Sequence, residues 1–270
     1  MTAQATHQAR LAVYRFMPEK RFQAILLPGG VLPAEFAYPD LLAALGDDVD
    51  GRAKELEMYA TDAPLPDYSL QYEIDGITRV ADDAGFERFH LVGYSGGGAA
   101  SLAFCAAHPE RLLSLALNEP AWAGRSGLSE DEAALWENFR EISTLPPQEL
   151  MPAFVALQLA PGVDPPPPPS GEPPPWMAKR PPGLKRFIEV FLESDLDTDA
   201  LRRFKGPVLF TLGGKSSPSY YKREAERLEK IFDDFTVEVF PERHHFDPPH
   251  RVEPGKLAQS LRALWERAGR

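Results

Sequence analysis

A serine lies at the centre of the most constraining stretch of this chain, which reads Gly-Tyr-Ser-Gly-Gly over residues 93–97. The short apolar run 89–92 precedes it, and residues 101–107, rich in helix-forming side chains, follow it. This pattern predicts a buried strand, a tight turn and a helix, because the glycines let the backbone bend without a clash at Cβ. On such a turn the hydroxyl of Ser95 projects from the edge of a sheet, where a ligand can reach it. The alternative is a glycine-rich turn that only joins a strand to a helix.

Apolar runs and helical patterns alternate along most of the chain. Strands are predicted over residues 11–16, 22–27, 56–60, 89–92, 111–117, 207–212 and 235–240. Helices are predicted over residues 38–45, 72–84, 101–107, 130–142, 150–159, 184–192, 220–232 and 254–268. Strands that alternate with helices indicate an α/β fold with a mostly parallel sheet, covered by helices on both faces.

The alternation is interrupted between residues 121 and 204, where the patterns predict helices and no strand. We therefore expect a core built from residues 1–120 and 205–270, with residues 121–204 inserted as a helical cap or lid. A proline-rich loop, residues 161–182, lies within this insertion, and its prolines favour extended polyproline II backbone. A stiff solvated loop is the simpler interpretation, and a docking site for a partner is the other.

Composition limits the classes of partner. The net charge is −11, and 43% of the 270 residues are hydrophobic, as in ordinary globular proteins. No cluster of basic side chains occurs, which argues against nucleic acid or an anionic membrane surface and favours a small-molecule substrate. Cys105 is the single cysteine, which excludes an intramolecular disulfide and predicts a packed thiol. A polar N-terminus and the lack of a long apolar run predict a cytoplasmic protein with no membrane insertion. Oligomeric state is not predicted.

Four short segments together resemble the α/β-hydrolase fold family, and the resemblance extends over essentially the whole chain. They are Pro-Gly-Gly at 28–30, the turn at 93–97, Glu119 after the following strand, and His-Phe at 245–246. The resemblance implies the α/β-hydrolase fold, with the helical insertion in the place of the family's cap or lid. It also implies a serine, an acid and a histidine that act together, in that order along the chain.

The chemistry needs these residue types for physical reasons. The hydroxyl of Ser95 is a weak nucleophile at neutral pH, so a base must take its proton. His245 suits this task because imidazole is largely neutral near pH 7. A carboxylate behind the ring sets its tautomer and stabilises the cation that forms. Such a mechanism needs no metal and no organic cofactor, and serine at position 95 excludes dehalogenase and epoxide-hydrolase chemistries that need aspartate there.

The acid departs from the common pattern of the family. Most members carry an aspartate after the strand that corresponds to residues 207–212, whereas here residues 213–217 read Gly-Gly-Lys-Ser-Ser. The family's second solution places the acid after the strand that follows the serine helix, and Glu119 lies there. Glu119 is therefore the predicted acid. A helix-terminal role for Glu119, Asp247 as the acid, and no acid at all stay open.

The histidine and the backbone donors also have alternatives. His244 and His250 compete with His245, which is favoured because an aromatic residue follows it. The resemblance assigns one oxyanion N–H donor to Gly96, the residue after the serine. The second comes from the loop after residues 22–27, with Gly30 as first choice and Val31 as second.

These residues predict a serine hydrolase that cleaves an ester, thioester or related acyl bond of a small, apolar substrate, in the manner of a carboxylesterase. The alternatives are acyl transfer, carbon–carbon bond cleavage or cofactor-free perhydrolysis on the same scaffold, and a non-catalytic ligand-binding relative. Apolar side chains of the insertion either line a pocket or pack the insertion onto the core: Phe139, Phe154, Leu157, Trp176, Phe187 and Phe191.

Overall fold

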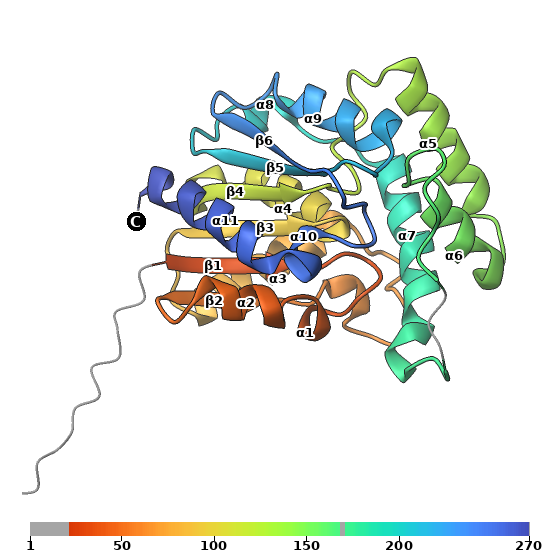
Figure 1. Ribbon diagram of the computed structural model, residues 1–270, viewed down its shortest axis with the longest axis horizontal. Coiled ribbons are helices and arrows are strands. Elements are labelled where there is room, and N and C mark those ends of the chain that lie inside the picture. Colours follow the sequence, from red (N-terminus) through yellow and green to blue (C-terminus); the bar gives the residue numbers. More distant parts are fainter. Residues whose placement is uncertain (1–21, 168–170, 270) are drawn as a thin grey trace, which may run out of the picture.

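The computed structural model describes residues 22–167 and 171–269, and six strands in these ranges form one parallel sheet (Figure 1). The spatial order of the strands is β2-β1-β3-β4-β5-β6. The strands are β1 (Phe22–Leu27), β2 (Val49–Ala53), β3 (Phe89–Tyr94), β4 (Leu112–Asn118), β5 (Val208–Gly213) and β6 (Phe235–Phe240). Because all six run the same way, their carboxyl ends meet at one edge of the sheet, where ligand sites of open α/β sheets form.

Helices connect the strands and cover the sheet. They are α1 (Ala34–Ala37), α2 (Pro39–Leu45), α3 (Leu70–Asp83), α4 (Gly96–Ala107), α5 (Glu130–Ile142), α6 (Pro147–Ala156), α7 (Arg180–Glu193), α8 (Thr198–Leu201), α9 (Arg223–Leu228), α10 (Pro249–Val252) and α11 (Pro254–Ala268). Short turns of other helix types are η1 (Glu57–Tyr59), η2 (Pro109–Arg111), η3 (Pro175–Lys179) and η4 (Pro218–Lys222). The α/β fold class with helices on both faces of the sheet is confirmed.

Side chains alternate between two hydrophobic clusters, one on each face of the sheet. In β1, Ala24 and Leu26 pack with α2 and α11, whereas Ile25 and Leu27 pack with α3 and α4. All four side chains are fully buried. This is the pattern of a central parallel strand, which is apolar on both sides.

The predicted strand at residues 56–60 is wrong. The strand that follows β1 along the chain is β2, residues 49–53. The predicted segment instead forms the turn η1, in which the N–H groups of Glu57 and Met58 donate to the carboxylate of Glu73 at 3.0 and 3.1 Å. A side chain therefore accepts the bonds that a neighbouring strand would otherwise take. β2 itself lies at the edge of the sheet, and its polar sequence, Val-Asp-Gly-Arg-Ala, hides it from a search for apolar runs.

The helices α5, α6 and α7 lie together beyond the carboxyl ends of the strands (Figure 1). α5 begins at a capping box, in which Ser129 and Glu132 satisfy each other's backbone N–H groups. The proline-rich loop predicted for 161–182 ends sooner, since η3 begins at Pro175 and α7 at Arg180. α8 packs against α4 of the core. That residues 121–204 act as a separate cap or lid stays a prediction.

Other predicted elements differ in extent. The helix predicted over 220–232 is η4 continued by α9, and it ends at Leu228. The strand predicted over 11–16 lies outside the described residues.

Candidate active site

Ser95 lies on the turn between β3 and α4 in a backbone conformation that few residues adopt, with φ 52° and ψ −117°. The turn requires glycine at positions 93 and 97, because backbone atoms of other residues lie where a Cβ would be. A Cβ on Gly97 would lie 2.5 Å from the carbonyl oxygens of Leu27 and Pro28, and one on Gly93 would lie 2.4 Å from the oxygen of Gly97. The predicted strand, turn and helix are therefore present, and the turn places the Ser95 side chain at the edge where the strands end.

His245 is brought to Ser95 from the loop between β6 and α10. Its ring Nε2 lies 3.0 Å from the Ser95 Oγ, and 1% of the residue is exposed. Tyr221 stacks on the ring at a centroid distance of 4.7 Å and an angle of 10°, and Phe246 contacts it edge-on. The hydroxyl of Tyr94 donates to the His245 carbonyl. The orientation of the imidazole is thus fixed from several sides.

Glu119 completes the chain of contacts from the end of β4. Its Oε2 lies 3.1 Å from Nδ1 of His245, and its Oε1 accepts the N–H of Gly213 at 2.7 Å. Because a carboxylate only accepts, Nδ1 carries the proton that it donates, which leaves Nε2 of the neutral ring to accept from the Ser95 hydroxyl. Among the described residues other than glycine, only Glu119 and Ser95 have positive φ, 43° and 52°. The structure brings together the three predicted side chains.

The turn at residues 213–217 has another part in the site. It carries no carboxylate, but the N–H of Gly213, at the end of β5, holds the carboxylate that β4 provides. No helix begins at Glu119, since the next one after β4 is α5. A helix-terminal role for Glu119 is therefore wrong.

The alternative residues have other partners. The His244 N–H donates to Asp247 at 2.5 Å, and Asp247 also pairs with Arg243 at 3.1 Å. Burial lowers the pKa of His244. His250 lies between the rings of Tyr38 and Tyr94, and burial lowers its pKa to about 3. Of the three histidines, His245 is therefore the one whose ring lies at hydrogen-bond distance from Ser95 Oγ.

Two glycines that were predicted as oxyanion donors lie beside Ser95 in one cavity, Gly30 and Gly96. Gly96 is the first residue of α4, so its N–H has no partner within the helix. The N–H of Gly97 is engaged by the carbonyl of Pro28 at 3.0 Å. Val31 lines a different cavity, together with His250. This arrangement favours Gly30 over Val31.

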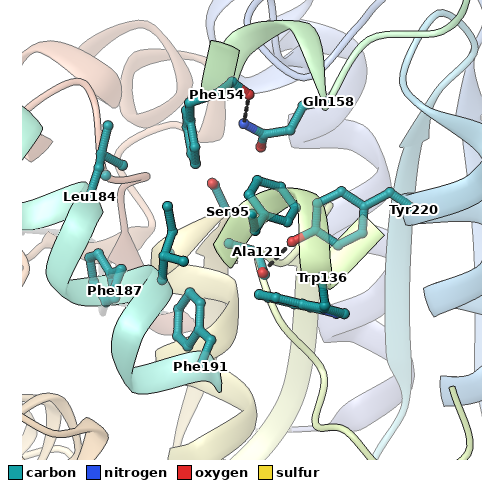
Figure 2. A pocket seen from close by; sticks show the side chains of 13 residues that line it. Ser95, Ala121, Trp136, Phe154, Gln158, Leu184, Phe187, Phe191 and Tyr220 are labelled. Atoms are coloured by element: carbon teal, nitrogen blue, oxygen red, sulfur yellow. Dashed lines mark hydrogen bonds between the residues drawn. The ribbon is translucent and has the colours of Figure 1, made fainter. Parts of the chain in front are cut away.

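The cavity above Ser95 is almost entirely apolar, and its hydroxyl points into the space that the surrounding side chains enclose (Figure 2). Most of the side chains come from α5, α6, α7 and η4. The lining residues are Gly30, Ser95, Gly96, Ala121, Trp136, Phe139, Phe154, Gln158, Leu184, Phe187, Ile188, Phe191 and Tyr220. Its volume is about 20 Å³, room for about one water molecule. A larger substrate requires these side chains or helices to move.

Four of the six apolar side chains considered from the sequence line this cavity: Phe139, Phe154, Phe187 and Phe191. Leu157 and Trp176 do not line it. Sequence reasoning did not identify Trp136, Gln158 and Tyr220. The heptad-like spacing of Leu184, Phe187, Ile188 and Phe191 marks an apolar helix face, but spacing alone does not say what that face covers.

Gln158 is the one lining amide, and the protein already uses both of its polar atoms. Its Nε2 donates to the carbonyl of Phe154 at 2.8 Å, and its Oε1 accepts the hydroxyl of Tyr221 at 2.6 Å. The hydroxyl of Tyr220 likewise donates to the carbonyl of Ala121 (Figure 2). No lining side chain carries a charge, so the cavity suits an uncharged ligand.

Other features of the described ranges concern metals, thiols and membranes. Within them, no three His, Cys, Asp or Glu side chains gather in an arrangement that could hold a metal ion. Cys105 is buried in α4, and burial raises the pKa of its thiol, as predicted for a packed cysteine. None of the helices in the described part of the chain has the length and apolar composition needed to cross a bilayer.

Comparison with known proteins identifies relatives by structure alone. No family model and no curated protein matches the chain. Among solved structures, a thermophilic esterase from Thermogutta terrifontis is similar over 93% of this chain and 92% of its own, with TM-score 0.67 and 16% identity. The naproxen esterase of Bacillus subtilis is similar over 92% and 85%, with TM-score 0.57 and 16% identity. A haloalkane dehalogenase variant from Bradyrhizobium elkanii is similar over 92% and 90%, with TM-score 0.58 and 16% identity.

These structures share a fold and differ in their chemistry, so the likeness alone does not choose a reaction. Each nevertheless covers nearly all of this chain. The parallel sheet and the helices on both of its faces agree with them. This chain therefore has the α/β-hydrolase fold.

Proposed function

We propose that the protein is a serine hydrolase that cleaves an ester or a related acyl bond of a small, uncharged, apolar substrate. The observation that carries the proposal is the position of His245, whose two ring nitrogens face the Ser95 hydroxyl at 3.0 Å and the Glu119 carboxylate at 3.1 Å. A ring held in this way can take a proton at one nitrogen while the carboxylate stabilises the charge at the other. Serine in this place separates the chain from relatives that attack with aspartate.

The reaction follows from the geometry in two halves. In the first, Ser95 Oγ attacks the acyl carbon while its proton passes to His245 Nε2, and the N–H groups of Gly30 and Gly96 hold the resulting oxyanion. The intermediate then expels the alcohol, which takes the proton back from Nε2. In the second half, water attacks the acyl-enzyme and gives a proton to His245 Nε2. As the acid leaves, His245 returns this proton to Ser95 Oγ, which restores the free hydroxyl.

The lining of the cavity supports an apolar acyl group. Its side chains are aromatic and aliphatic, and Gln158 already has partners for both of its polar atoms. A charged group placed there would lose its hydration without a partner. The esterases among the structural relatives are compatible with this proposal.

The alternative functions are of two kinds: reactions that use the same serine nucleophile, and ligand binding without catalysis. Acyl transfer, carbon–carbon cleavage and perhydrolysis use the same nucleophile and differ in what leaves or attacks. A non-catalytic receptor was suggested by the turn at 213–217 without a carboxylate, and the contacts of Glu119 remove that argument.

A series of p-nitrophenyl esters with acyl chains of two to ten carbons tests the proposal, with Ser95→Ala as the matched control. We expect saturable hydrolysis that favours short or medium acyl chains and is lost in Ser95→Ala. Hydrolysis that Ser95→Ala retains, or no hydrolysis of any ester in the series, would contradict the proposal. Quantifying the free acid against transferred acyl product separates hydrolysis from transfer.

A further inference from the structure

The loop after β1, residues 28–33, carries the proposed oxyanion donor Gly30 and is called the oxyanion loop. Gly30 has no side chain that could anchor its backbone. Glycine has more backbone freedom than other residues, and a donor that moves is a poor stabiliser of transition-state charge. Other residues occupy the space that a side chain here would fill. A Cβ on Gly30 would lie 2.8 Å from Cδ2 of Leu184 and 3.4 Å from the hydroxyl oxygen of Tyr59.

Tyr59 makes a directional contact with this glycine. Its hydroxyl donates to the Gly30 carbonyl at 2.7 Å, and the residue is only 6% exposed. The hydrogen bond fixes the direction of this carbonyl and with it the plane of the Gly30–Val31 peptide. The N–H of Gly30 belongs to the preceding peptide, so this bond constrains it through the shared α-carbon of Gly30. The side chain of Leu184, from α7, occupies the space next to the Gly30 α-carbon. Together they hold a residue that has no side chain to hold itself.

The ring of Tyr59 is in turn held by one stretch of α7. The guanidinium of Arg180 lies 3.8 Å from the ring centroid, within the range of a cation–π contact, and pairs with Glu55 at 3.2 Å. The backbone at Gly183 packs against the ring so closely that a Cβ there would lie 2.2 Å from its Cε1. Arg180, Gly183 and Leu184 therefore connect α7 to Tyr59 and Gly30.

We propose that Tyr59 is a positioning residue that holds the Gly30 amide in place for the oxyanion, and that α7 holds Tyr59 there. The inference rests on the proposed function and adds residues that do not touch the reacting atoms. It also gives α7 two roles. Phe187 and Ile188 of this helix line the acyl cavity, and Arg180 and Leu184 hold the oxyanion loop in place. A change in this helix should then alter turnover as well as specificity.

The test is Tyr59→Phe, which removes the hydroxyl and keeps the ring. We expect kcat to fall by about 10-fold on the best p-nitrophenyl ester, less than the loss of a whole oxyanion donor, with KM changed less than twofold. The affinity for a trifluoromethyl ketone, which forms a tetrahedral oxyanion on the serine, should weaken by a similar factor. A purely structural effect would change thermal stability without this parallel.

Tyr72→Phe is the matched control, because it makes the same change of tyrosine to phenylalanine, and the hydroxyl of Tyr72 donates to Asp67 at 2.8 Å instead of to the loop. We expect its kcat to stay within twofold of the wild type. Arg180→Met tests the contribution of α7 and should produce a smaller loss of the same kind. Unchanged kcat in Arg180→Met would overturn the part assigned to α7.

The two proposals fail in different ways. A wild-type protein that hydrolyses no ester overturns both of them. An active wild type whose Tyr59→Phe variant matches it in kcat and in ketone affinity overturns only the positioning role. Equal losses in Tyr59→Phe and Tyr72→Phe would also overturn it, because the hydroxyl at the loop would then have no special effect.

Discussion

The strand ends below Ser95 and the helices above it are held by different interactions. Below, directional hydrogen bonds join the site: Ser95 to His245 at 3.0 Å, and Glu119 to the Gly213 amide at 2.7 Å. Above, rings pack against rings, as Phe187 does on Phe191 at 5.3 Å between centroids. Hydrogen bonds depend steeply on geometry, whereas apolar packing is not directional and tolerates repacking.

This contrast has a consequence for function. The strand ends should be sensitive to changes that keep shape and alter a donor or an acceptor. The helices should respond to changes of side-chain volume and tolerate most other apolar changes. Arg180 and Leu184 are the exceptions, because they reach the oxyanion loop. Chemistry and specificity are therefore separable in most of the site.

The largest effect is expected at Glu119. Glu119→Gln keeps the shape of the side chain but presents an amide to His245, so the ring loses both its tautomer and the stabilisation of its charge. We expect kcat to fall by about 10³–10⁴, as with the corresponding change in a serine protease. Steady-state kinetics on the best ester measures this.

Asp247→Asn is the matched control, since Asp247 bonds to His244 and Arg243 and not to the ring of His245. Its kcat should stay within about threefold of the wild type. If Asp247→Asn lost activity and Glu119→Gln kept it, Asp247 would be the acid. The account of the hydrogen bonds at the strand ends would then be wrong.

A smaller effect is expected in the helices. Phe154→Ala removes a ring from the cavity lining, and each additional buried methylene contributes about 0.8 kcal/mol. We expect kcat/KM for the hexanoate ester relative to the acetate ester to rise by about 10- to 100-fold. Phe36→Ala, which removes a ring that is 51% exposed, should leave the ratio unchanged.

A thermal melt of Phe154→Ala accompanies this test, because the deletion of a buried ring costs about 3 kcal/mol or more. An unchanged ester ratio in a folded variant would show that α6 does not limit the acyl group. The claim that the helices above Ser95 determine specificity would then have no support from α6.

The smallest effect concerns the backbone of Ser95. Its positive φ is strained for any residue with a Cβ, and such strain costs about 1–3 kcal/mol. Ser95→Gly and Ser95→Ala both remove the hydroxyl, but only glycine relieves the strain. We expect Ser95→Gly to be the more stable of the two by about 1 kcal/mol in urea unfolding. Equal stability, or a more stable Ser95→Ala, would mean that the turn stores no strain.

The sequence predicts the strand-end half of the site well because its signals are local. The spacing of glycines around Ser95 reflects backbone contacts within the turn itself, and Glu119 directly follows a clearly apolar strand. The absence of a carboxylate over 213–217 was also visible. Only the partner that the turn offers instead, the amide of Gly213, required the structure.

The other half depends on contacts between distant segments. Tyr59 lies on a turn stabilised by Glu73, and its hydroxyl reaches a glycine far back in the chain. The strand β2 was missed because an edge strand can be polar. The apolar face of α7 was recognisable, but its position against Gly30 and Gly96 depends on contacts between segments that lie far apart in the sequence.

The central claim, a serine activated by a histidine, is tested most directly by labelling with a fluorophosphonate and locating the adduct by peptide mass. The account predicts one adduct on the wild type, at Ser95, and labelling slowed by about 100-fold or more in a folded His245→Ala variant. A folded wild type that takes up no label, or a His245→Ala variant labelled at the wild-type rate, would contradict it.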